Sequence, residues 1–250
     1  MVVTVIIPVY NRRETLPFAV ASILRQSCAL PLDILIVDDG SSDATPEVIE
    51  DLMRHHPEIR AVRRANGGVA KARNTGLDNL RPDTAFVTFL DSDDVMAPDR
   101  FTGDLAILLE HPEVEITYGD MIMTFGIDMN SFTVPSGAKH LRLTSIHLSC
   151  CLFRRALIDR IGGFDESMQQ AEDTDYILRI FESGTTFRQT ETVCHLYLRH
   201  EGNMSSDHND NRLWFARALL KSIRRRKLNP GLRLIKPEFN IELPRDFWEA

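Results

Sequence analysis

Three aspartates stand close together in the first half of the sequence and could hold a metal ion. Asp91, Asp93 and Asp94 fall within four residues, directly after an apolar run at 85–90. Carboxylates this close repel one another unless a cation lies among them, and Mg²⁺ or Mn²⁺ suits one or two carboxylates together with phosphate oxygens. The alternative is a helix N-terminus, because acidic side chains favour the positive end of the helix that we expect at 100–110.

A second acidic group, Glu172 and Asp173, precedes a helix that we expect at 174–182. A carboxylate in such a place can act as a general base toward a substrate hydroxyl. It can equally be a helix-capping residue, because Asp and Glu are favoured at helix N-termini. The residues alone leave both interpretations open.

Two further segments carry groups that suit a nucleotide. Asp38 and Asp39, followed by glycine and serine, can accept hydrogen bonds from a nucleobase or a ribose, although the same residue types form ordinary turns. At 66–74, two glycines precede a helix whose first turns carry Lys71 and Arg73. These cations can neutralise a diphosphate, or they can form a solvated basic face.

The elements that would position these groups alternate as they do in a parallel α/β sheet. Buried strands are indicated by apolar and β-branched runs, and helices by amphipathic segments between them. We expect strands at 3–8, 33–37, 59–63 and 85–90, and helices at 14–26, from Thr45, at 69–80 and at 100–110. Ligands bind such sheets beyond the carboxyl ends of the strands, where the polar segments stand.

The second half of the sequence is less regular. We expect strands near 116–118, 148–153 and 193–198, and helices at 155–161, 174–182 and 212–227. The last helix is basic and has an apolar stripe. We expect the stripe to pack on the core or on a second subunit, as in a homodimer. The alternative is that it lies on an anionic membrane surface, which would suit a lipid-linked acceptor.

Composition excludes several classes of protein. The 250 residues carry a formal net charge of -7, which argues against general nucleic-acid binding. We find no basic leader and no apolar run of the ~20 residues that a transmembrane helix needs, so we expect a cytoplasmic protein. The four cysteines form no Cys-x-x-Cys pair, and we expect reduced, buried thiols.

Taken in order, the motifs resemble the family 2 glycosyltransferases. They are Val9-Tyr10-Asn11, the Asp38 and Gly67 segments, the Asp91 segment, Gly163-Phe164-Asp165-Glu166 and Glu172-Asp173. The resemblance spans residue 3 to about 205. It implies an α/β fold of GT-A type, with a Rossmann-like, mostly parallel sheet and helices on both faces. It divides 1–205 into a nucleotide-sugar-binding half, 1–98, and an acceptor-side half, 99–205, and leaves 206–250 as a C-terminal helical extension.

The resemblance also implies a role for each motif residue. The donor nucleotide would be held by residues of four segments: Pro8, Tyr10, Asp39, Lys71, Arg73, Asp91 and Ser92. Uracil is the favoured base, and Lys71 and Arg73 would lie near the phosphates. Asp93 would coordinate Mn²⁺ or Mg²⁺ as part of an Asp-x-Asp motif. His200 would complete the metal shell, unless it is a plain surface residue. Asp173 would be the catalytic base, with Glu172 beside it.

The implied activity is the inverting transfer of one sugar from a UDP-sugar to a hydroxyl of a glycan or lipid-linked acceptor, within polysaccharide or glycan biosynthesis. Single-sugar transfer is favoured because the sequence lacks the Gln-x-x-Arg-Trp motif that processive polysaccharide synthases of this family often carry. Acceptor choice is expected at 128–149 and 165–170. One alternative is a catalytically silent nucleotide-binding protein on the same fold. Another is a sugar nucleotidyltransferase, which would usually show a glycine-rich loop where this chain has 8–13 without glycine.

Overall fold

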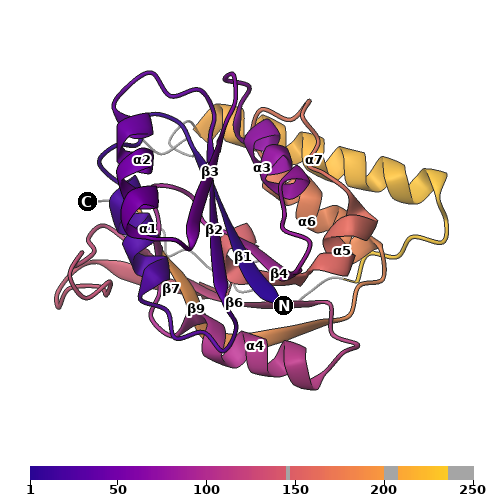
Figure 1. Ribbon diagram of the computed structural model, residues 1–250. Helices are drawn as coiled ribbons and strands as arrows, with labels where there is room; N and C mark the ends of the chain where they lie inside the picture. The colour runs from indigo at the N-terminus through magenta and orange to yellow at the C-terminus, as the bar shows by residue number, and fades with distance from the viewer. Residues whose placement is uncertain (145–146, 200–207, 236–250) are drawn as a thin grey trace.

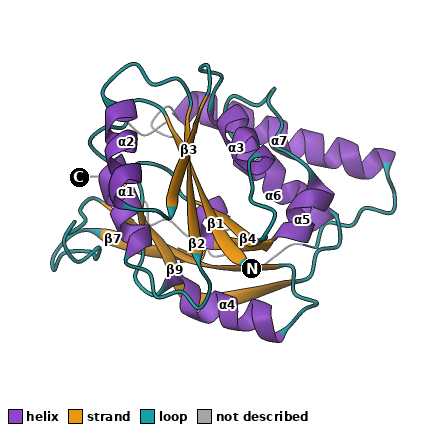
Figure 2. Ribbon diagram, in the orientation of Figure 1, coloured by secondary structure: helices purple, strands orange, loops and turns teal. Residues whose placement is uncertain are grey.

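The computed structural model describes residues 1–144, 147–199 and 208–235, and in these the strands form one curved sheet flanked by helices (Figures 1 and 2). The strand order of this nine-stranded sheet is β3-β2-β1-β4-β8-β6-β9-β5, and β7 pairs with β6. Its first four strands are parallel: β1 (Val2–Val9), β2 (Leu32–Asp38), β3 (Ile59–Arg63) and β4 (Thr84–Phe89).

The central strand β1 is buried along its whole length, which explains its continuous apolar sequence. Val5 and Ile7 face a core formed with α1 (Leu16–Leu24), α2 (Thr45–His55) and α4 (Arg100–Glu110). Ile6 faces the opposite core, formed with α3 (Val69–Asp78), α5 (Arg155–Ile161) and α6 (Glu172–Glu182). Figure 2 shows α1 and α2 on one side of the sheet and α3, α5 and α6 on the other. The alternation of side chains along one strand therefore builds two cores.

The second half adds strands of mixed direction. They are β5 (Val95–Met96), β6 (Ile116–Thr124), β7 (His140–Thr144), β8 (Cys151–Arg154) and β9 (Phe187–Leu198). Strand β8 joins the two halves because it pairs antiparallel with both β4 and β6. Strands β6 and β9 run parallel, and β5 and β7 pair antiparallel with β9 and β6. A 3₁₀ turn (Leu148–Cys150) precedes β8, and the long helix α7 (His208–Leu228) ends the described fold.

The predicted fold class, with helices on both faces of the sheet, is confirmed. The strands β5 and β7 were not predicted, and the strand expected at 148–153 begins only at Cys151. Helix α6 begins at Glu172 rather than at residue 174, so the second acidic group lies in the first helical turn. All four cysteines are free thiols, and all but Cys28 are buried. No helix among the described residues has the length and apolar character needed to cross a membrane.

We expected the apolar stripe of the last helix to pack on the core or on a second subunit. Packing on the core of this chain is wrong for most of the stripe, and packing on a second subunit stays a prediction. Leu213 and Leu220 are 70% and 65% exposed, and Ile223 is also exposed. Among residues 212–228 of α7, the buried side chains are Ala218 and Ser222, which lie on the opposite face of the helix. The residues that follow Ile235 lie outside the described part, so the extension predicted to reach residue 250 is described only in part.

Candidate functional site

A cavity of about 730 Å³ opens beyond the carboxyl ends of β1, β2 and β4, next to the N-terminus of α6. Among its lining residues are nine of the side chains that the sequence singled out: Pro8, Tyr10, Asp39, Arg73, Asp91, Ser92, Asp93, Glu172 and Asp173. Segments up to 165 residues apart in the sequence thus meet in one place. This position is where an open α/β sheet is expected to bind its ligand.

The loop after β2 is fixed against the loop before α3 by hydrogen bonds to Asp39. The Asp39 carboxylate accepts hydrogen bonds from the backbone N–H of Gly67 (3.1 Å) and of Gly68 (2.7 Å). Gly40 allows this close approach, because its φ is +78° and a Cβ there would lie 2.7 Å from the backbone nitrogen of Asn66. Asp39 is therefore held in a set orientation at the cavity wall.

Arg73 is the buried cation of the site. Its guanidinium is almost fully buried and donates to Asp91 Oδ1 at 2.8 Å and to Glu172 Oε1 at 2.5 Å. It also lies over the ring of Phe164, 5.6 Å from the centroid. One side chain thus joins the end of β4 to the start of α6. Because both hydrogen-bonding ends are engaged with carboxylates, Arg73 fixes the two acidic segments relative to each other.

The charges of this cluster shift one another's protonation. Burial alone would lower the pKa of Arg73, but the two carboxylates outweigh burial and raise it. Burial would raise the pKa of Asp91, yet the guanidinium beside it brings that pKa below its usual value. For Glu172 burial prevails over the attraction of Arg73, with help from the charge of Asp173, and raises the pKa to about 7.

The three aspartates after β4 have different environments. Asp91 is bound by Arg73, whereas Asp93 faces the cavity and pairs with Arg12, whose Nε lies 3.5 Å from Asp93 Oδ2. Asp94 is buried, and burial together with the charges of Asp91 and Asp93 raises its pKa well above the usual value. Its Oδ2 faces His195 Nε2 at 3.6 Å.

A divalent cation fits this donor set in chemistry, since Asp91 and Asp93 offer carboxylate oxygens at the cavity wall and hard cations prefer oxygen. Within the described ranges, no group of three or more His, Cys, Asp or Glu side chains is arranged to hold a metal. The other predicted ligand, His200, lies outside the described residues. A metal site built by Asp93 and His200 therefore stays a prediction.

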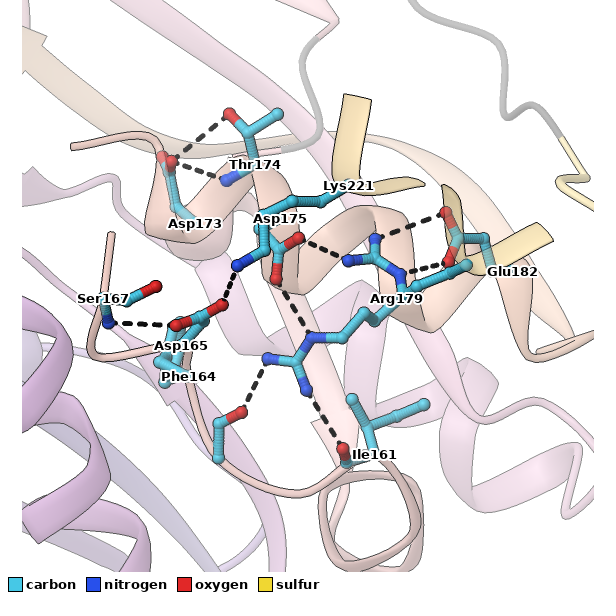
Figure 3. A network of polar contacts seen from close by, with 12 residues as sticks. Ile161, Phe164, Asp165, Ser167, Asp173, Thr174, Asp175, Arg179, Glu182 and Lys221 are labelled. Atoms are coloured by element: carbon cyan, nitrogen blue, oxygen red, sulfur yellow. Dashed lines mark hydrogen bonds and ion pairs between the residues drawn. The ribbon is translucent and has the colours of Figure 1, made fainter. Parts of the chain in front are cut away.

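Asp173 lies in the first turn of α6, partly exposed to the cavity. Its Oδ1 accepts hydrogen bonds from the backbone N–H of Thr174 at 2.6 Å and from the Thr174 hydroxyl at 3.3 Å (Figure 3). Its Oδ2 faces His147 Nε2 at 3.9 Å. One carboxylate oxygen is thus held by the helix start, and the other is turned toward a histidine.

His147 and Arg12 are among the cavity residues that were not predicted from the sequence. His147 lies within the segment 128–149 that was assigned to acceptor choice, but no local motif marks it, and it stacks on His195 with ring centroids 5.3 Å apart. Arg12 lies in the loop after β1, and in this region only Pro8, Tyr10 and the motif Val9-Tyr10-Asn11 were singled out from the sequence. Lys71, by contrast, is not among the residues that line the cavity, and its Cδ packs beside Gly67. Its predicted role at the phosphates stays a prediction.

Comparison with known proteins shows the family of this chain. The family model for glycosyl transferase family 2 matches residues 4–162. The chain is 26% identical over 220 residues to the uncharacterized glycosyltransferase EpsJ of Bacillus subtilis, covering 81% of this chain and 62% of that protein. It is 35% identical over 183 residues to the minor teichoic acid biosynthesis protein GgaA of the same organism, covering 68% of this chain and 41% of GgaA. The chain thus spans less than two thirds of the length of these curated relatives.

Solved structures share the fold. TarS of S. aureus, residues 1–349 in complex with UDP-GlcNAc, matches with a TM-score of 0.67 at 22% identity, over 88% of this chain and 67% of that one. The mannosyltransferase PcManGT of Pyrobaculum calidifontis, in complex with GDP-Man and Mn²⁺, matches with a TM-score of 0.63 at 20% identity, over 92% of this chain and 66% of that one. Since the family model covers more than half of the sequence, and the fold agrees, the chain belongs to glycosyl transferase family 2.

Proposed function

We propose that the cavity binds a UDP-sugar and that the chain transfers its sugar, one unit at a time and with inversion, to a hydroxyl of a glycan or lipid-linked acceptor. The observation that carries this proposal is the convergence of Asp39, Asp93 and Asp173 on one cavity beyond the sheet. The relative GgaA, named for teichoic acid biosynthesis, and the UDP-GlcNAc complex of TarS support the choice of donor and pathway class.

The donor nucleotide would lie along the carboxyl ends of β1 and β2. Pro8 and Tyr10 would contact the base, and Asp39 would accept hydrogen bonds from it, because its carboxylate is already oriented by two backbone amides. Asp91 and Ser92 would meet the ribose side of the donor. Arg73 holds Asp91 in place, so we assign it a positioning role beside its predicted attraction for the phosphates.

Asp173 is proposed as the general base. Thr174 fixes one of its oxygens, which leaves Oδ2 on the cavity side to take the proton of the acceptor hydroxyl. The deprotonated oxygen then attacks the anomeric carbon from the face opposite the leaving diphosphate, and positioning of both substrates contributes much of the rate. A single displacement inverts the anomeric centre. Linkage analysis that shows retention would contradict this step.

The leaving diphosphate needs positive charge nearby. Asp93, together with the predicted ligand His200, would hold Mn²⁺ or Mg²⁺. Such an ion, when bound, neutralises charge that develops on the departing diphosphate. Arg12, which pairs with Asp93, adds a cation at the same end of the cavity.

The proposal can be tested by thermal unfolding with UDP, GDP, CMP and dTDP, each with and without Mn²⁺. A ligand at a hundredfold excess over its Kd stabilises by about 2.7 kcal/mol, which corresponds to roughly 5–10 °C for a chain of this size. We expect a shift with UDP that requires Mn²⁺ and disappears in Asp93→Ala. No shift with any nucleotide would indicate a catalytically silent protein, and release of pyrophosphate in place of UDP would indicate a nucleotidyltransferase.

A further inference from the structure

The described side chains of helix α7 that form ion pairs with the α/β body lie on one face of the helix. Lys221 pairs with Asp165, and Arg225 pairs with Asp175 (2.6 Å) and with Glu182 (2.8 Å) on α6. Figure 3 shows Lys221 paired with Asp165, in the segment before α6, and Figure 1 shows α7 along the outer side of α6, at the edge of the molecule. These ion pairs fix which face of α7 points away from the protein.

The outward face of α7 is apolar. Leu213, Ala216, Leu220 and Ile223 follow one another at intervals of three and four residues, so they form one stripe along the helix. All four are exposed, and Leu213 and Leu220 leave more than half of their surface in water. Monomeric proteins seldom expose a continuous apolar stripe unless it contacts something.

The flanks of this stripe are basic. On the helical wheel, Arg217 and Arg224 lie on one side of the stripe and Arg226 lies on the other, with Lys227 at its end. Residues 212–228 contain seven Lys or Arg and no Asp or Glu, whereas the whole chain has a net charge of -7. Arg217 and Arg224 also line a groove of about 800 Å³ between α6 and α7. The positive charge is thus concentrated on this helix.

The signs of these charges distinguish between possible partners. If two copies of the chain paired through the stripe, the arginines that flank it on one copy would face arginines on the other and repel them. Paired helices normally carry opposite charges beside their apolar seam. An anionic lipid surface suits both the apolar stripe and its basic flanks, since it accepts apolar side chains at the level of the headgroups and attracts Lys and Arg. We propose that the outward face of α7 docks this protein onto an anionic lipid bilayer.

Docking in this way would place the cavity close to the membrane. Arg212 and Phe215, at the start of α7, also line the cavity that holds Asp173. A lipid-linked acceptor could therefore reach the site while its lipid stays in the bilayer, a consequence that rests on the proposed function. Docking itself does not depend on it.

Vesicle co-sedimentation tests the proposal on the full chain, without nucleotide or acceptor. We expect binding to vesicles of phosphatidylcholine mixed with phosphatidylglycerol and none to phosphatidylcholine alone. Arg224→Glu changes the charge by two, and because each Lys or Arg near the surface contributes about fivefold, it should lower the partition coefficient about 25-fold. Leu220→Glu should lower it about tenfold or more, through loss of apolar contact and added negative charge. Met53→Glu, at an exposed position of α2, is the matched control and should bind as the wild type does.

Three results would overturn the proposal. They are absence of binding to the anionic vesicles, equal binding by Leu220→Glu and the wild type, and a dimer in light scattering that Leu220→Glu converts to monomers. Circular dichroism verifies that each variant folds, which is expected because the substituted side chains are exposed. Asp93→Ala should bind vesicles like the wild type, so failure of docking and failure of the proposed donor site give different results.

Discussion

Replacing Arg73 by methionine should destabilise the protein strongly, because Arg73 compensates two carboxylates at once. Arg73 is 4% exposed, and its guanidinium donates to Asp91 at 2.8 Å and to the buried Glu172 at 2.5 Å. Methionine keeps much of the side-chain volume and removes the charge and all five donors. The substitution therefore measures the electrostatic role of the residue rather than its packing.

The magnitude follows from the burial of the pair. Removing one partner of a buried ion pair costs about 3–5 kcal/mol, because the remaining charge is left uncompensated. For a chain of 250 residues this corresponds to a fall in Tm of about 6–20 °C. The cost should shrink toward acidic pH, because Glu172, whose pKa is already raised to about 7, then takes up a proton and no longer needs a cation.

Unfolding by guanidinium chloride at pH 8 and at pH 5.5 measures the free energy of unfolding that Arg73→Met loses at each pH. Arg81→Met is the control, since Arg81 pairs with Asp83 at 3.1 Å while both side chains are about half exposed, and exposed pairs contribute no more than about 1 kcal/mol. Adding Glu172→Gln to Arg73→Met should recover part of the lost stability. If Arg73→Met cost no more than Arg81→Met, the electrostatic account of the cluster would be refuted.

Three further predictions concern single residues. The pKa of Glu172 is raised from 4.5 to about 7, so the folded state keeps this proton to higher pH than the unfolded chain, and the free energy of unfolding falls as pH rises through this window. Glu172→Gln removes this pH dependence. In denaturant titrations, the stability difference between wild type and variant should therefore change by about 3 kcal/mol between pH 4.5 and 8. Gly40→Ala should cost about 1–3 kcal/mol, because the positive φ and the contact with Asn66 resist a Cβ; a loss like that of an exposed alanine substitution would contradict this. His147→Ala should lower kcat more than it raises KM for the donor, because His147 faces Asp173 Oδ2; steady-state kinetics would refute this if only KM changed.

The first half of the fold could be predicted because its strands carry a strong local signal. Strand β1 is buried on both faces, and its run of apolar residues shows this directly in the sequence. The loops at the strand ends followed from the same pattern, which is why Asp39, Asp91 and Asp93 could be named as one site. Here, short-range sequence information sufficed.

The rest depends on contacts between distant residues. Arg73 was predicted from its place in a helix, but its partner Glu172 is 99 residues away, and no periodicity reveals that pairing. His147 reaches Asp173 only because the 3₁₀ turn that follows it and β8 are placed beside β4 by long-range pairing. Strand β5 has two residues, and it forms a strand because it pairs with β9. The partner of the exposed face of α7 could not be predicted for the same reason, since helical periodicity does not show what a helix packs against.

If Asp173 is the base of a donor site for UDP-sugars, Asp173→Asn should lose turnover while it keeps UDP binding. UDP release from a panel of UDP-sugars can be followed without added acceptor, with water in the acceptor position, while UDP binding is measured separately by calorimetry. We expect Asp173→Asn to bind UDP as the wild type does but to release UDP from UDP-sugars about 10²–10⁴-fold more slowly. Release of UDP at the wild-type rate by Asp173→Asn would contradict this role of Asp173.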